Sequence, residues 1–311
     1  MSRRPSAFSA LVAIDTPAGL TSHDVVSRVR RAVGEKRVGH AGTLDPAATG
    51  VLVVGIGQAT RLLGLLTLER KGYLATLALG AETTTDDAEG EVTATAAVPP
   101  ELLEPGRAAE EVARLVGERD QVPPRFSAVS VGGRRAYDAA RAGEELELSA
   151  RHVTIHAAML VGVRPDERSW VVGLDVSKGT YVRSIARDLG RELGCLAHVS
   201  ELRRTFSGPV TLADCVSLDE LEERGADLAR ERCLDPVAAL GLRVRDLAVE
   251  EVADVVSGRR IPAGALRDGG APAPEERVAL VFDGGLVGIW RREGARLVCV
   301  SNFPQGIEGV R

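Results

Sequence analysis

The 311-residue chain has few cysteines and no long uncharged run, and each scarcity excludes a class of protein. The longest obvious uncharged segment, residues 46–60, is shorter than the roughly 18 to 20 residues that a membrane helix needs. We therefore expect no membrane-spanning helix. The cysteines stand singly, without Cys-x-x-Cys spacing, which indicates core thiols in a reducing compartment and not a zinc or redox site. They are Cys195, Cys215, Cys233 and Cys299.

Signals for export and for metal binding are also weak. Arg3 and Arg4 precede an apolar stretch, but Asp15 interrupts it and no small-residue cleavage site follows, so we expect a cytoplasmic protein without a signal peptide. His152 and His156 lie in HVTIHAAMLVGV, which alternates like a strand and lacks the helix of a zincin-type site. We expect no metal.

Charge is unevenly distributed along the chain, although the net charge is only −5. Residues 1–80 carry ten Lys and Arg against five Asp and Glu, and residues 121–141 carry four against one. Residues 86–120 reverse this balance, with three against ten. A basic face with acidic flanks fits a phosphate-backbone partner, although solvated surface faces would explain the charges equally well.

The most informative stretch is VGHAGTLDPAATGVLVVGIGQATR, residues 38–61. Asp45 is its last charge before Arg61, and the following VLVVGIG is apolar and β-branched enough to be a strand buried on both faces. Pro46 favours an extended backbone at Asp45, which would aim the carboxylate into a cleft. The alternative is that Asp45 caps a short helix that begins at Pro46, and the two interpretations are compatible.

The string G-H-A-G-T-L-D-P-x-A-T-G-V-L closely resembles the signature of the TruB family of tRNA pseudouridine synthases. The resemblance implies that Asp45 is the catalytic aspartate and that His40 fills or props the gap left by a flipped base. It also implies isomerisation of uridine to pseudouridine without a cofactor. The opening D-T-P-A-G-L-T-S is similar to the family's D-K-P-x-G-x-T-S, with Thr16 in place of the usual lysine.

Further family motifs follow along the chain. K-G-Y before an alternating strand implies that Tyr73 stacks on the target base. G-T-Y-V-R implies that Arg183 pairs with Asp45 and that Tyr181 lines the same pocket. A-H-V-S-E-L-R-R implies that Leu202 lies beside the base.

The segment PPRFSAVSVGGRRAYDAAR also resembles a family motif, with Ser130 where lysine is common. It makes Arg134, Arg135 and Arg141 candidates for contacts with the RNA backbone.

Local patterns predict several elements. Thr21 and Asp24 have the spacing of a capping box for a helix that ends at Gly34. Residues 105–118 resemble an acidic amphipathic helix, and HVTIHAAMLVGV and SWVVGLDVS are strands. Thr180 is expected to cap a helix whose first turn contains Arg183, where the helix dipole disfavours a cation, so an anion should compensate.

We expect an α+β protein: a mixed, mainly antiparallel catalytic domain of the pseudouridine synthase type at residues 1–240, with an insert at about 82–120. Residues 241–311 change to a helix and three short strands, VALVFD, GLVGIW and ARLVCV. We interpret them as a small β-rich RNA-binding domain that resembles the PUA-type appendage of the family.

The resemblance favours a monomeric enzyme that isomerises uridine 55 in the T-arm of tRNA. Three alternatives remain. The RNA-guided synthase subunit of archaea and eukaryotes is the closest, but the insert and the lack of a basic tail favour the stand-alone bacterial type. A non-catalytic RNA-binding or chaperone protein is disfavoured by the central anion Asp45. A dinucleotide-binding turn at VLVVGIGQATRLLGLL lacks its third glycine, since Thr60 stands there.

Overall fold

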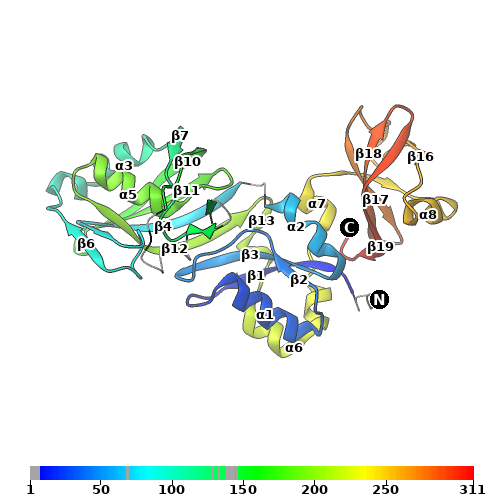
Figure 1. Cartoon of the computed structure of the whole chain (residues 1–311), viewed down its shortest axis with the longest axis horizontal. Coiled ribbons are helices and arrows are strands. Elements are labelled where there is room, and N and C mark those ends of the chain that lie inside the picture. Colours follow the sequence, from blue (N-terminus) through cyan, green and yellow to red (C-terminus); the bar gives the residue numbers. More distant parts are fainter. Residues whose placement is uncertain (1–7, 68–69, 128, 132–133, 137–143, 145) are drawn as a thin grey trace. The chain divides into compact units, whose positions relative to one another are not determined.

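The structure is a computed structural model that describes residues 8–67, 70–127, 129–131, 134–136, 144 and 146–311. The chain forms two units (Figure 1). We call residues 1–46, 50–68 and 207–311 the terminal unit, and residues 47–49 and 69–206 the central unit. Among the described residues, none of the helices has both the length and the hydrophobicity that crossing a membrane requires.

The first sheet of the terminal unit has the strand order β14-β1-β3, and β2 pairs with β3. β1 runs parallel to β14 and antiparallel to β3. The elements around this sheet are β1 (Ala10–Thr16), α1 (Ser22–Val33), β2 (Val38–His40), β3 (Ala48–Ile56), η1 (Gly57–Arg61), α2 (Leu63–Leu66), β13 (Val210–Thr211), η3 (Leu212–Asp214), β14 (Cys215–Ser217), α6 (Leu218–Glu231) and α7 (Pro236–Leu240).

Strand β3 is buried on both faces, as its uncharged β-branched sequence predicts. Leu52 and Val54 pack in a cluster with residues of α1 and α6, which cover one face of the sheet (Figure 1). Val51 and Val53 point to the opposite cluster, which contains residues of α7 and of the C-terminal strands. Since successive strand residues point to opposite faces, only an apolar run satisfies both clusters.

The C-terminal segment forms a second sheet in the terminal unit, with the order β15-β17-β18-β19-β16. Its buried cluster includes Trp290, which is fully buried. The predicted helix and three strands are present, whereas the PUA-like character and the boundary at residue 240 stay predictions. The elements are β15 (Arg243–Asp246), α8 (Val249–Val256), β16 (Ile261–Pro262), β17 (Arg277–Phe282), β18 (Gly285–Glu293) and β19 (Arg296–Ile307).

The sheet of the central unit has the order β12-β4-β11-β10-β7, and α3 and α5 contribute to the apolar cluster that it buries. Fully buried Trp170 of β11 donates its indole N–H to the Leu102 carbonyl at 2.8 Å. The elements are β4 (Lys71–Leu79), β5 (Ala81–Thr83), β6 (Val92–Thr95), η2 (Pro100–Leu103), α3 (Pro105–Ala113), β7 (Gly117–Gln121), β8 (Ser130–Val131), β9 (Arg134–Arg135), β10 (Arg151–Arg164), β11 (Ser169–Val176), α5 (Val182–Glu192) and β12 (Ala197–Ser207).

Helix α1 confirms the sequence prediction at both ends. Thr21 and Asp24 form the expected capping box, and Gly34 ends the helix with a left-handed φ of 67°. The predicted helix 105–118 is too long, because α3 ends at Ala113 and β7 begins at Gly117. β7 pairs with β10, and this non-local pairing removes the last residues from the helix.

Two further interpretations of the central stretch are wrong. No helix begins at Pro46, because Pro46 and Ala47 form a turn and β3 starts at Ala48. The dinucleotide-binding interpretation fails because β3 runs antiparallel to β1 and leads into a 3-10 turn, whereas such a site needs parallel strands and a full helix.

Candidate active site

Asp45 lies half-buried in the loop between β2 and β3, and both of its neighbours are anchored. The N–H of Leu44 donates to the Ser22 hydroxyl at 2.8 Å, and that hydroxyl donates to the Leu44 carbonyl at 3.3 Å. The N–H of Gly19 donates to the Pro46 carbonyl at 2.8 Å. The start of α1 and the turn before it therefore fix the backbone on both sides of the carboxylate.

The path of this loop depends on two glycines. Gly42 has a φ of 92° and Gly50 a φ of 101°, a conformation that residues with a Cβ rarely adopt. These glycines let the chain turn sharply before Asp45 and again as β3 begins.

His40 is the last residue of β2 and is half-buried. Its ring meets the ring of His23 edge to face, with centroids 5.7 Å apart and planes at 80°. His23 is exposed in the first turn of α1, so His40 is held beside the same helix start that anchors Leu44.

Tyr73 and Leu202 belong to the central unit and lie on β4 and β12. Both are partly buried and pack against the same apolar cluster, which includes Leu174 and Val199. The structure thus brings these two sequence candidates to one cluster.

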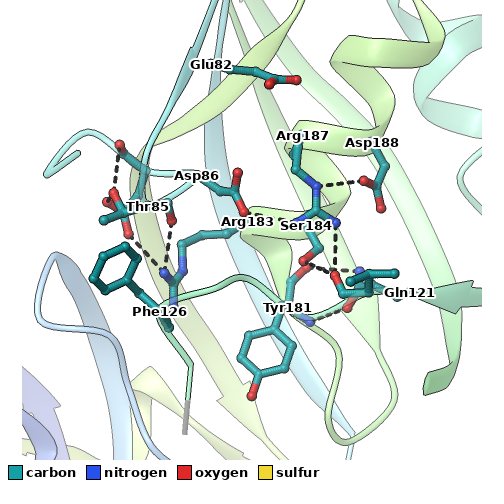
Figure 2. A network of polar contacts seen from close by, with 12 residues as sticks. Glu82, Thr85, Asp86, Gln121, Phe126, Tyr181, Arg183, Ser184, Arg187 and Asp188 are labelled. Atoms are coloured by element: carbon teal, nitrogen blue, oxygen red, sulfur yellow. Dashed lines mark hydrogen bonds and ion pairs between the residues drawn. The ribbon is translucent and has the colours of Figure 1, made fainter. Parts of the chain in front are cut away.

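Tyr181 is the N-cap residue of α5, and the predicted cap Thr180 is wrong. The side chain of Gln121 takes the place of a local cap. Its carbonyl oxygen accepts from the Tyr181 N–H at 2.8 Å, and its amide donates to the Tyr181 carbonyl at 3.1 Å. Figure 2 shows the ring of Tyr181 pointing away from Arg187.

Arg183 lies in the first turn of α5, as predicted, and is only 5% exposed. Its guanidinium donates to the carbonyls of Thr85 and Phe126, both at 3.1 Å. One nitrogen also lies 3.4 Å from a carboxylate oxygen of Asp87. An anion, Asp87, therefore compensates for the unfavourable position of Arg183 in the helix dipole. The sequence patterns did not identify Asp87 as that anion.

The Asp87 carboxylate is itself oriented by its own turn. One oxygen accepts from the Thr85 hydroxyl and from the N–H of Glu89, and the other faces Arg183. The sequence signal was the pair of adjacent acids in TTTDDAEG, inside the segment that we interpreted as an insert.

Asp86, the neighbour of Asp87, makes a second buried ion pair with α5 (Figure 2). Its carboxylate lies 3.1 Å from the guanidinium of Arg187. Burial raises the pKa of Asp86 above its ordinary value, and attraction to Arg187 offsets only part of that increase. Because burial disfavours the charged form of Asp86, this carboxylate depends strongly on Arg187 to remain ionised.

The candidate RNA-backbone contacts are only partly described. The guanidinium of Arg134 binds both carboxylate oxygens of Glu144, at 2.7 and 3.0 Å. Arg141 and the side chain of Arg135 lie outside the described residues.

His40 and Asp45 belong to the terminal unit, whereas Tyr73, Tyr181, Arg183 and Leu202 belong to the central unit. The pairing of Arg183 with Asp45 therefore stays a prediction. In the described part of the chain, no three His, Cys, Asp or Glu side chains gather closely enough to hold a metal ion.

Two family models match consecutive parts of the chain. Residues 30–182 match "TruB family pseudouridylate synthase (N terminal domain)". Residues 183–240 match "tRNA pseudouridylate synthase B C-terminal domain".

Curated relatives named tRNA pseudouridine synthase B match most of the chain. The protein of Thermobifida fusca is 49% identical over 86% of this chain and 92% of the relative. The protein of Mycobacterium tuberculosis strain H37Rv is 46% identical over 94% of each chain.

Solved structures agree on the fold. A crystal structure of the archaeal box H/ACA sRNP Nop10-Cbf5 complex matches with a TM-score of 0.66 and 23% identity, over 95% of this chain and 86% of that chain. A Cbf5-Nop10-Gar1 complex matches with a TM-score of 0.64 and 22% identity, over 98% and 92%. The family models and the curated relatives together establish that this chain belongs to the TruB family of tRNA pseudouridine synthases, enzymes that isomerise uridine to pseudouridine.

Proposed function

We propose that this enzyme isomerises uridine 55 in the T-arm of tRNA, with Asp45 as the catalytic carboxylate. In the reaction, the bond between ribose C1′ and uracil N1 breaks and a bond from C1′ to C5 forms. C5 loses one proton and N1 gains one, so no cofactor or co-reactant is consumed. A carboxylate that acts as nucleophile or stabilises charge is the group that such a step requires.

The observation that most supports Asp45 is its place in the family string on a loop that Ser22 and Gly19 hold from both sides. A catalytic group must keep its geometry while a base is flipped out, which costs a few kcal/mol of unstacking. An anion also contributes nothing to binding phosphate. Asp45 therefore fits catalysis better than RNA binding alone.

The remaining roles follow the family motifs. Tyr73 stacks on the base, Leu202 lies beside it, and Tyr181 lines the pocket, while His40 props the gap in the RNA. Arg183 pairs with Asp45 in the complex with RNA, where a planar guanidinium fixes the orientation of a carboxylate better than an ammonium does. The enzyme acts as a cytoplasmic monomer.

Asp45→Asn tests the assignment directly. We expect it to abolish pseudouridine formation while tRNA binding stays within roughly tenfold of wild type, since no phosphate contact is lost. Tritium release from T-arm RNA measures the reaction, and filter binding measures the affinity. Turnover near the wild-type rate would remove Asp45 from the chemistry.

The substrate proposal has its own test, because the name tRNA pseudouridine synthase B of the curated relatives does not say which uridine is modified. If the enzyme recognises the fold of the T-arm, an isolated T-stem-loop should be modified without any added RNA. Activity that requires a guide RNA would favour the RNA-guided alternative.

A further inference from the structure

We propose that Arg187 is a positioning residue for the reaction, because it holds in place the two chain segments that grip Arg183. This inference rests on the proposed catalytic role of Arg183. The two segments are the turn 83–87 and the segment 121–126, and all the contacts lie within the central unit.

Arg183 and Arg187 each bind both segments. Arg183 binds the turn through Asp87 and the carbonyl of Thr85, and it binds the second segment through the Phe126 carbonyl. Arg187, one helical turn later, binds the turn through Asp86 at 3.1 Å and the second segment through the Val122 carbonyl at 2.9 Å. Residues four apart lie on one face of a helix, so Arg187 repeats the contacts of Arg183 one turn further along α5.

The guanidinium of Arg187 is itself fixed, because all three of its nitrogens have partners (Figure 2). Its Nε donates to Asp188 at 2.8 Å, which sets the plane of the group. The Val122 carbonyl also accepts from the Ser184 hydroxyl at 2.9 Å. A lysine has three donors on a flexible stem and cannot reproduce this planar set of bonds.

The backbone of Asp86 is strained where the turn contacts Arg187. Its φ is 60°, which is uncommon for a residue other than glycine and persists only when surrounding contacts enforce it. The N–H of Val199 donates to the Asp86 carbonyl at 3.1 Å, and Arg187 holds the side chain. Because Asp87 is the next residue, this conformation determines where the Asp87 carboxylate meets Arg183.

A third ion pair on the same helix supplies the contrast. Arg191, four residues after Arg187, pairs with Glu82, but its side chain is 57% exposed. The side chain of Arg187 is 10% exposed and that of Asp86 12%. Within the part of the chain that the structure describes, Arg191 donates its side-chain hydrogen bonds to Glu82 and none to segment 121–126, so it is the matched control.

The experiment compares Arg187→Lys with Arg191→Lys in single-turnover reactions at saturating enzyme. We expect Arg187→Lys to slow the chemical step by about tenfold or more, on the scale of a small misplacement of a catalytic group, with tRNA affinity nearly unchanged. Arg191→Lys should react at the wild-type rate. A wild-type rate for Arg187→Lys would overturn the proposal.

A double-mutant cycle with Arg183→Lys distinguishes positioning from a general loss of structure. If Arg187 acts through Arg183, adding Arg187→Lys to Arg183→Lys should slow the reaction by less than about twofold further. Rate losses that multiply would show that Arg187 acts independently and would contradict the proposal. Asp86→Asn, which cuts the same link from the other side, replaces Arg187→Lys in the cycle if that variant folds poorly.

The cycle also tests the roles of Arg183 and Arg187 separately. If Arg183→Lys alone reacts at the wild-type rate, the proposed role of Arg183 fails, and the role of Arg187 fails with it. If Arg183→Lys is slow but Arg187→Lys is not, only the positioning role fails.

Discussion

Helix α5 and the C-terminal sheet both pair arginines with carboxylates, but they place the pairs in different surroundings. On α5 the pairs Arg183–Asp87 and Arg187–Asp86 have side chains that are 12% exposed or less. At the C-terminal sheet, Asp246 of β15 forms a bidentate pair with Arg267 of the loop between β16 and β17, with one distance of 2.9 Å, yet both side chains are about half exposed. Similar chemistry therefore has different consequences in the two regions.

The pKa shifts follow this difference. Hydrogen bonds from Arg267 lower the pKa of Asp246, because they outweigh the desolvation that raises it. Burial raises the pKa of Asp86 in spite of its arginine. In the buried region a cation is needed to keep the carboxylate charged, whereas in the exposed region water would serve almost as well.

The largest expected effect is on catalysis. Arg183→Lys should lower the rate of the chemical step by at least roughly 10²-fold with little change in tRNA affinity, since it loses buried charge-assisted bonds. Arg267→Lys should leave that rate unchanged. Single-turnover kinetics at saturating enzyme measures both. If Arg183→Lys instead bound RNA weakly and reacted at the normal rate, Arg183 would be a phosphate contact.

A smaller effect is expected on stability. Arg187→Met leaves the Asp86 carboxylate buried without its cation, and the free energy of unfolding should fall by about 3 to 5 kcal/mol. Arg243→Met, which breaks the pairs of this 40% exposed arginine with Asp268 and Glu276, should not measurably change that free energy. Urea denaturation followed by circular dichroism compares the two.

The control for this prediction is the double variant Asp86→Asn, Arg187→Met. Removing the stranded charge should recover part of the lost stability. Equal losses in the single and double variants would mean that packing, and not the unpaired charge, causes the effect.

The smallest effect is a pH dependence of opposite sign in the two regions. The folded pKa of Asp86 lies above its ordinary value of 3.8, so the folded state binds the proton more tightly than the unfolded chain. The stability of wild type relative to Asp86→Asn should therefore fall as pH rises above 3.8 toward the folded pKa.

The folded pKa of Asp246 lies below 3.8, so its contribution is complete above that pH and is lost as pH falls through the folded pKa. Wild type should gain stability over Asp246→Asn as pH rises through this range. Urea midpoints between about pH 3 and pH 6 test both signs. Slopes of the same sign would show that burial does not shift the pKa values of Asp86 and Asp246 in opposite directions.

The elements that the sequence predicted well are those whose signals are local. The capping box of Thr21 and Asp24, the terminal Gly34 and the apolar run of β3 each act within a few residues, and each prediction is confirmed. The predictions that failed concern residues with distant partners. Gln121, 60 residues away, binds the backbone of Tyr181 in place of a local cap.

The candidate residues themselves came from motifs, because a family motif consists of particular residue types at a fixed spacing along the chain. The support for Arg183 could not be obtained in this way. Its partners Thr85 and Phe126 lie 98 and 57 residues away in sequence. Both accept through a backbone carbonyl, which every residue type has, so no sequence pattern marks them.

The sequence by itself determined the family, the candidates Asp45 and Arg183, and local elements such as α1 and β3, because these depend on residue identity and short-range periodicity. Only the tertiary structure decided which carboxylates meet which arginines and which of those pairs are buried. TTTDDAEG presents two adjacent acids that look like ordinary solvated residues. Their importance arises because folding places them against α5, where water is excluded and each charge must find its partner within the protein.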